Sequence, residues 1–153
     1  MLVKGGHKRG FSILELLIVI TIIGVIAAIA IPNLLKAMNR GKQKRTMSDI
    51  RTIGVSVESY SVDNDLPPQS VSQIILANIQ GHLEPTFIKI LPAQDAWKAQ
   101  FVYRAKNKEY SLRSFGKDGV SEGEVGPGET RNYNCDIIFS DGQFVRYPVG
   151  AQD

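Results

Sequence analysis

The feature that most constrains this chain is an apolar run near its N-terminus that contains one carboxylate. From residue 11 to residue 31 the only charged side chain is that of Glu15. At about 1.5 Å per residue, a helix of this length spans the roughly 30 Å hydrocarbon core of a bilayer. An ionised carboxylate there costs on the order of a few kcal/mol unless a partner neutralises it. Because the run holds no cation, the partner of Glu15 must belong to another chain, which indicates assembly.

Basic residues are concentrated on both sides of the apolar run. Lys4, Lys8 and Arg9 precede it and account for the whole formal charge of +3. After the run comes a basic collar that faces a single acid, Asp49, and consists of Lys36, Arg40, Lys42, Lys44, Arg45 and Arg51. A basic segment beside a membrane suits anionic lipid headgroups. Since no nucleic-acid recognition motif accompanies it, we expect no nucleic-acid partner.

Residues with reactive chemistry are few. Cys135 is the only cysteine, so no internal disulfide is possible, and we expect it to be a small buried hydrophobe rather than a reactive thiol. His82 is the only histidine outside the first ten residues, and no serine or cysteine lies in a nucleophile motif. We expect His82 at the surface beside Gly81 and predict that the chain is not an enzyme.

Three interpretations of the apolar run are open. An ordinary secretory signal peptide also has a basic start, and Ala28-Ile29-Ala30 matches a cleavage signal, but Glu15 is out of place there and helix formers continue beyond it. A plain membrane anchor is the second interpretation. Its orientation stays open, because more positive charge follows the run than precedes it.

The third interpretation comes from Arg9-Gly10-Phe11-Ser12-Ile13-Leu14-Glu15, a segment that resembles the type IV prepilin signal. In that family a dedicated peptidase on the cytoplasmic side cuts after the glycine and methylates the new N-terminal residue. The resemblance implies cleavage between Gly10 and Phe11, loss of a leader of residues 1–10, and N-methylation of Phe11. It also implies that Glu15 meets the amine of Phe11 on a neighbouring subunit, and that the C-terminal domain lies outside the cytoplasm.

One long helix is predicted from about residue 12 to residue 62, with residues 11–32 as its transmembrane and assembly part and 33–65 as its amphipathic continuation. Gly24 and Pro32 weaken it, and in assembled filaments of the prepilin family the stretch between two such residues can become extended. Past the bilayer, apolar residues recur in steps of three and four, namely Leu34, Leu35, Met38, Met47, Ile50, Ile53, Val57 and Tyr60. We expect the part from Met47 onward to pack beneath the domain's own sheet, whereas residues 11–38 need lipid or other helices.

Residues 66–153 predict a small globular domain that makes the chain α+β. Ser70-Val71-Ser72-Gln73 matches a capping box and predicts a short helix through Gln80, closed by Gly81. Strands are predicted at residues 100–104, 110–115, 136–139 and 143–147, with Ser140-Asp141-Gly142 as a turn. These elements predict an antiparallel sheet laid against the C-terminal half of the long helix, which is the pilin-like arrangement.

This half of the chain resembles the major pseudopilin of type II secretion. The resemblance rests on residues 91–97 (LPAQDAW), the strand with Phe101 and Tyr103, residues 110–119 (YSLRSFGKDG) and Asp136-Ile137. Where the family often has Asp-Pro-Trp-Gly, this chain has Asp95-Ala96-Trp97-Lys98.

An acidic, glycine-rich loop covers residues 116–136. Hard oxygen donors on a flexible loop suit Ca²⁺, and the resemblance implies a calcium ion held by Asp118 and Asp136. Relatives commonly place a further aspartate where this chain has Cys135, so Glu122, Glu124 or backbone carbonyls would have to replace that ligand. A solvated acidic loop without metal is the alternative.

Taken together, these features predict a structural subunit of a helical filament, made as a prepilin and anchored in the bacterial inner membrane by a single span. The type II secretion pseudopilus is the favoured filament. Expected partners are copies of the chain, the prepilin peptidase, the inner-membrane assembly platform and membrane lipid. The alternatives are a type IV pilin for adhesion, motility or DNA uptake, and a membrane-anchored monomeric binding domain.

Overall fold

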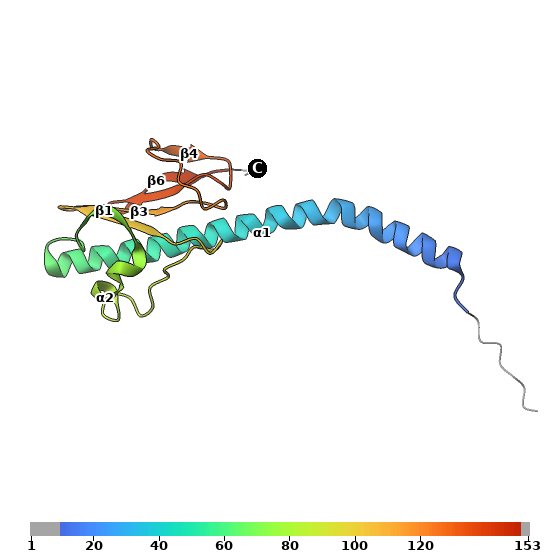
Figure 1. Ribbon diagram of the computed structural model, residues 1–153, viewed down its shortest axis with the longest axis horizontal. Coiled ribbons are helices and arrows are strands. Elements are labelled where there is room, and N and C mark those ends of the chain that lie inside the picture. Colours follow the sequence, from blue (N-terminus) through green and yellow to red (C-terminus); the bar gives the residue numbers. More distant parts are fainter. Residues whose placement is uncertain (1–9, 151–153) are drawn as a thin grey trace, which may run out of the picture. The chain divides into compact units, whose positions relative to one another are not determined.

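The computed structural model describes residues 10–150 and contains one long helix and a six-stranded sheet (Figure 1). The helix is α1 (Ile13–Asn64), and two short helical elements, η1 (Leu76–Ile79) and α2 (Gln80–Leu83), follow the first strand. The strands are β1 (Ser70–Ile75), β2 (Val102–Lys106), β3 (Glu109–Ser114), β4 (Gly128–Thr130), β5 (Ile137–Ser140) and β6 (Gln143–Pro148). The predicted α+β class is confirmed.

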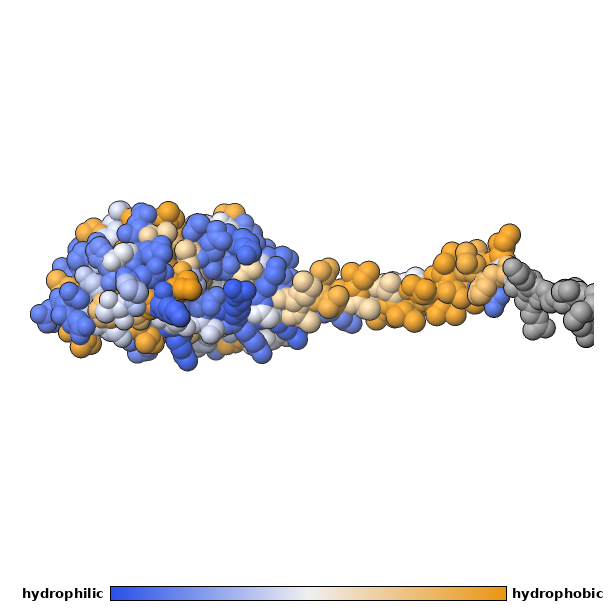
Figure 2. Space-filling view, turned by 90° about the horizontal axis from the view of Figure 1, so that it is seen from below, coloured by the Kyte–Doolittle hydropathy of each residue, from blue (hydrophilic) through white to orange (hydrophobic). Residues whose placement is uncertain are grey.

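Helix α1 passes through two compact units, of which the first ends at Ala37 and the second begins at Met38. In the first unit the helix is long and apolar enough to cross a membrane, judged by length and composition. Its hydrophobic residues form the orange surface in Figure 2. The helix is continuous through Gly24 and Pro32, so the extended form implied for assembled filaments stays a prediction.

In the second unit, α1 packs on the sheet through the apolar face that the sequence predicted. Ile50, Ile53 and Val57 are fully buried, and Met47 and Tyr60 pack at the edge of the same core. From the sheet come Tyr103, Leu112, Ile137 and Phe139, joined by Phe101, Leu76 and Leu83. The prediction that the apolar face packs beneath the domain's own sheet from Met47 onward is therefore confirmed.

The sheet has the order β1-β2-β3-β5-β6-β4 and is antiparallel except for the β4–β6 pair. The hairpin between β5 and β6 turns at Asp141 and Gly142, both with positive φ, as a tight two-residue turn requires. All four predicted strands are present within two residues of their expected positions. Strand β4 was not predicted, because three residues, one of them glycine, are too short to show an alternating pattern.

The predicted helix over residues 70–80 is wrong. Ser70–Ile75 is strand β1, which pairs with the edge of β2 through Ile74 opposite Tyr103. The Ser70 hydroxyl donates to the Ser72 carbonyl rather than capping a helix. Helical turns begin only at Leu76, and Gly81 lies inside α2 instead of closing it. Pairing with a free sheet edge outweighs the local capping signal.

Candidate functional site

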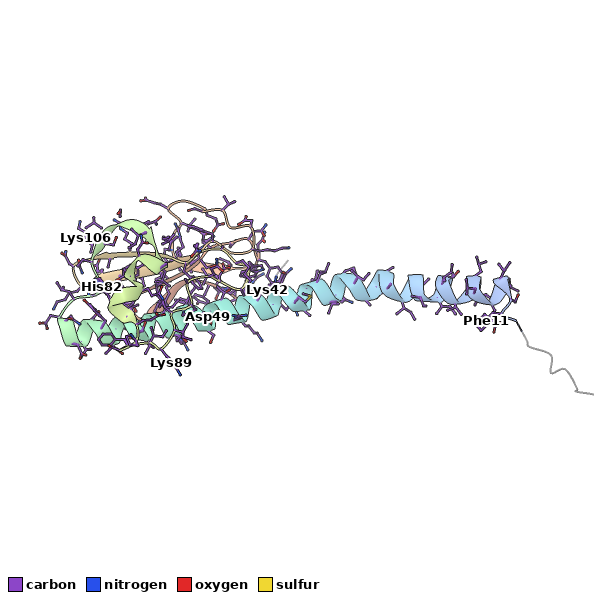
Figure 3. The ribbon with its side chains drawn as sticks, turned by 60° about the horizontal axis from the view of Figure 1, so that its bottom comes forward. Phe11, Lys42, Asp49, His82, Lys89 and Lys106 are labelled. Carbon is purple, nitrogen blue, oxygen red and sulfur yellow. The ribbon has the colours of Figure 1, made fainter. Side chains whose placement is uncertain are left out.

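The predicted processing residues lie at the N-terminal end of the described chain and are exposed. Gly10 and Phe11 precede the first turn of α1, and the Phe11 side chain is 74 % exposed (Figure 3). A Cβ added at Gly10 would meet nothing within 4 Å. The remaining leader residues, 1–9, lie outside the described part of the chain. No other described residue therefore covers the bond between Gly10 and Phe11.

Glu15 lies in the first turn of α1, where the unpaired backbone amides of a helix favour negative charge. Among the described residues it makes no hydrogen bond or ion pair. The large hydrophobic residues from Phe11 to Met38 are all at least 46 % exposed. Within residues 10–35 the helix therefore has a carboxylate without a partner among the described residues and an apolar surface around it, which is what a membrane or neighbouring helices would cover.

The polar residues inside this apolar segment bond to their own helix. The Thr21 hydroxyl donates to the Leu17 carbonyl at 2.7 Å, so Thr21 needs no partner from outside. Glu15 is different, because its charge cannot be satisfied in this way.

The basic collar lies on α1, from Lys36 at the end of the first unit to Arg51 in the second. Figure 3 labels Lys42 there, together with Asp49. Asp49 pairs with Arg45 one turn away at 3.6 Å, in an exposed geometry that contributes little to stability. Arg51 lies over the ring of Phe144, 5.7 Å from its centre. The collar remains predominantly a cationic surface.

The acidic loop does not assemble the two aspartates that the resemblance implies as calcium ligands. Asp118 is exposed, and its carboxylate accepts a hydrogen bond from the Val120 amide. Asp136 is fully buried and forms an ion pair with Arg113, with 3.2 Å between Nε and Oδ2. No group of three or more His, Cys, Asp or Glu residues between positions 10 and 150 could hold a metal ion.

A second ion pair neutralises the neighbouring carboxylate of the loop. Glu122 accepts the Asp136 amide at 3.0 Å and pairs with Arg146 at 2.9 Å. Burial alone would raise the pKa of Glu122, but the Asp136 amide and the Arg146 charge outweigh it and hold that pKa below its usual range. Burial raises the pKa of Asp136 despite the amide of Glu122 and the nearby Arg113.

These carboxylates do not fit a calcium site. Calcium takes six to eight oxygen ligands, whereas the buried Asp136 and the exposed Glu122 each already face a guanidinium. One lone atom, Asp136 Oδ1, is buried without a hydrogen-bond partner, which is far short of a coordination sphere. Calcium binding stays a prediction from the resemblance.

His82 and Cys135, the residues with potential catalytic chemistry, have an exposure close to that predicted from the sequence. His82 is exposed on α2, with its ring 5.9 Å from that of Tyr60. Cys135 is half-buried, and burial, followed by the charge of Glu122, raises the pKa of its thiol. A thiol that resists ionisation is a poor nucleophile.

Sequence comparison matches both halves of the chain. Residues 33–133 match the family described as "Type II secretion system (T2SS), protein G", and residues 6–31 match the prokaryotic N-terminal methylation motif. Type II secretion system core protein G of Escherichia coli (strain K12) is 32 % identical over 122 residues, which cover 73 % of this chain and 83 % of that protein. The Pectobacterium carotovorum protein of the same name is 27 % identical over 145 residues, covering 87 % and 89 %.

A more distant relative is the type IV major pilin protein PilA of Myxococcus xanthus. It is 35 % identical over 76 residues, or 50 % of this chain and 34 % of the pilin. No solved structure matches the chain. Because the family match covers most of the sequence, this chain belongs to the type II secretion system protein G family.

Proposed function

We propose that this chain is the repeating subunit of a type II secretion pseudopilus, made as a prepilin and assembled from the inner membrane. The observation that carries the proposal is the combination of an exposed apolar helix with a Glu15, in its first turn, that has no partner among residues 10–150. Membership of the protein G family supports a type II secretion filament, and the match to the methylation motif supports cleavage and methylation.

Processing supplies the missing partner of Glu15. A cut between Gly10 and Phe11 creates a positively charged amine at Phe11. In an assembled filament, the carboxylate of one subunit and the amine of the next neutralise each other across an interface. Identical surfaces that repeat in this head-to-tail way build an open helix rather than a closed ring.

The membrane arrangement follows from the same proposal. Residues 11–32 cross the inner membrane once, the second unit lies in the periplasm, and the basic collar lies at the outer headgroups, where anionic lipid attracts it. A C-terminal alkaline phosphatase fusion tests the orientation: activity is expected, and an inactive but stable fusion would contradict a periplasmic domain.

The role of Glu15 is tested with Glu15→Ala in the full-length chain, expressed with the secretion machinery. We expect filaments and secretion to be lost while the membrane-bound protein is retained, because one buried charge per interface loses its partner. Thr21→Ala is the matched control, since its hydroxyl is satisfied within the helix. Filaments of Glu15→Ala as abundant as those of the control would refute the intersubunit role.

Processing is tested with Gly10→Val. Nothing lies within 4 Å of a Cβ at this position, so the substitution leaves the subunit itself undisturbed and acts on peptidase recognition alone. Mass spectrometry is expected to show the full leader on the variant and a methylated Phe11 on the parent. A parent that begins at Met1 would overturn the proposal.

A type IV pilin is the second candidate, and the similarity to the Myxococcus pilin favours it over a monomeric binding domain. Deletion of the gene distinguishes the two filament types. We expect exported enzymes to accumulate in the periplasm, whereas loss of twitching motility, adhesion or DNA uptake with secretion intact would indicate the pilin.

A further inference from the structure

Arg113 makes an unusual set of contacts in the acidic loop. It lies on β3, opposite Ile138 of β5, and is only 9 % exposed. Its guanidinium pairs with the Asp136 carboxylate at 3.2 Å, donates to the Gly123 carbonyl at 2.5 Å and approaches the Ser121 hydroxyl at 3.4 Å. A carboxylate, a carbonyl and a hydroxyl are the kinds of oxygen that bind a calcium ion. Here they surround a side chain that is permanently positive.

Neither Asp136 nor Glu122 has an unmatched negative charge that would attract a divalent ion. Asp136 is matched by Arg113, and Glu122 is matched by Arg146 of β6, the strand that pairs with β4 inside the loop (Figure 1). The two acids are tied to each other as well, since each accepts the backbone amide of the other. Four side chains thus form a network without net charge.

We propose that the Arg113 guanidinium is the cation that holds the acidic loop, residues 116–136, together without calcium. Its guanidinium joins the two ends of the loop, with Ser121 and Gly123 on one side and Asp136 on the other. The same arrangement excludes a metal, because a divalent ion beside Asp136 would lie against a fixed positive charge.

The test uses the full-length chain in detergent micelles, with thermal unfolding followed by the fluorescence of Trp97, the only tryptophan. The parent is expected to melt at the same temperature in millimolar calcium and in excess EGTA. Arg113→Gln should lower the melting temperature by more than about 10 °C, since it leaves a buried carboxylate unpaired. It should also expose residues 116–136 to limited proteolysis.

Arg104→Gln is the matched control, because Arg104 is an exposed arginine on the adjacent strand that donates to the Val71 carbonyl. It should shift the melting temperature by no more than about 2 °C. A rise in the parent's melting temperature with calcium would overturn the proposal, and so would an Arg113→Gln variant as stable as the control. If Arg113→Gln fails to fold, the calcium and EGTA comparison on the parent still decides.

Discussion

Replacing Gly54 with alanine tests how closely α1 approaches the sheet. Gly54 is buried in the helix, and a Cβ added there would lie 3.0 Å from Cζ and 3.2 Å from Cδ1 of Phe139, with Cε1 closer still. Carbon atoms normally pack at about 3.5–4.0 Å. Phe139 cannot turn aside easily, because it is 2 % exposed and its ring packs edge-on against Phe144 at 5.0 Å.

Two opposing effects determine how much Gly54→Ala changes the free energy of unfolding. Alanine is a better helix former than glycine by about 1 kcal/mol, which favours the variant. Overpacking a core costs typically 1–3 kcal/mol, and several short contacts with one immobile ring place this site near the upper end. The net loss of unfolding free energy is therefore about 2 kcal/mol. For a domain of this size, that corresponds to a decrease of roughly 8–16 °C in melting temperature.

Gly41→Ala is the control for this experiment. Gly41 lies in the same helix but is exposed, and a Cβ there would meet nothing within 4 Å. Only the propensity effect operates at this position, so thermal unfolding should show a gain of about 0.5–1 kcal/mol. The two alanines are thus expected to act in opposite directions. If Gly54→Ala stabilises the domain as much as Gly41→Ala does, the close approach of helix and sheet is wrong.

Three further predictions concern the second unit. Asp95 is 4 % exposed and accepts hydrogen bonds from the Trp97 and Ala99 amides and the Ser114 hydroxyl. Asp95→Ala should therefore lower the free energy of unfolding, measured in urea, by about 4 kcal/mol. A decrease below about 1 kcal/mol would contradict this prediction. Lys98 has a φ of 78°, so Lys98→Gly should stabilise the domain by about 1 kcal/mol, and a destabilised variant would show that the turn tolerates lysine without strain. Burial raises the pKa of the Tyr103 and Tyr110 phenols, which keeps both protonated in the folded state while the unfolded chain ionises. Stability should therefore be constant up to about pH 10 and fall above it, which the melting temperature measured against pH will show. A melting temperature that stays constant through about pH 11 would refute the raised pKa of the two phenols.

Periodic patterns predicted the parts of the fold that local sequence determines. The steps of three and four placed Ile50, Ile53 and Val57 on the buried face of α1, because that spacing puts side chains on one side of any helix. Likewise, Asp141-Gly142 marked the β5–β6 hairpin, since both residues tolerate positive φ.

The features that the sequence did not predict depend on tertiary contacts. Residues 70–75 carry a helix-start signal, yet they pair with the free edge of β2 and form a strand. The turn at Lys98 keeps a positive φ although the glycine usual in the family is absent, because Asp95 accepts two amides that fix it. Arg113 was not singled out as a site residue. A single arginine within a strand pattern carries no signal of the acids that the loop later brings to it.

Asp136 and Glu15 show two ways to resolve a carboxylate that is removed from water. The cation for Asp136 lies in the same chain, so losing Arg113 should damage the folded subunit before any assembly takes place. Glu15 has no partner among the residues described, and under the proposed function a second chain neutralises it, so its loss should leave the subunit folded. Glu15→Ala should therefore melt like the parent and fail to assemble, whereas Arg113→Gln should lose stability as an isolated subunit. Measuring both properties on both variants separates folding from assembly, and a Glu15→Ala subunit that is itself unstable would show that the two are coupled.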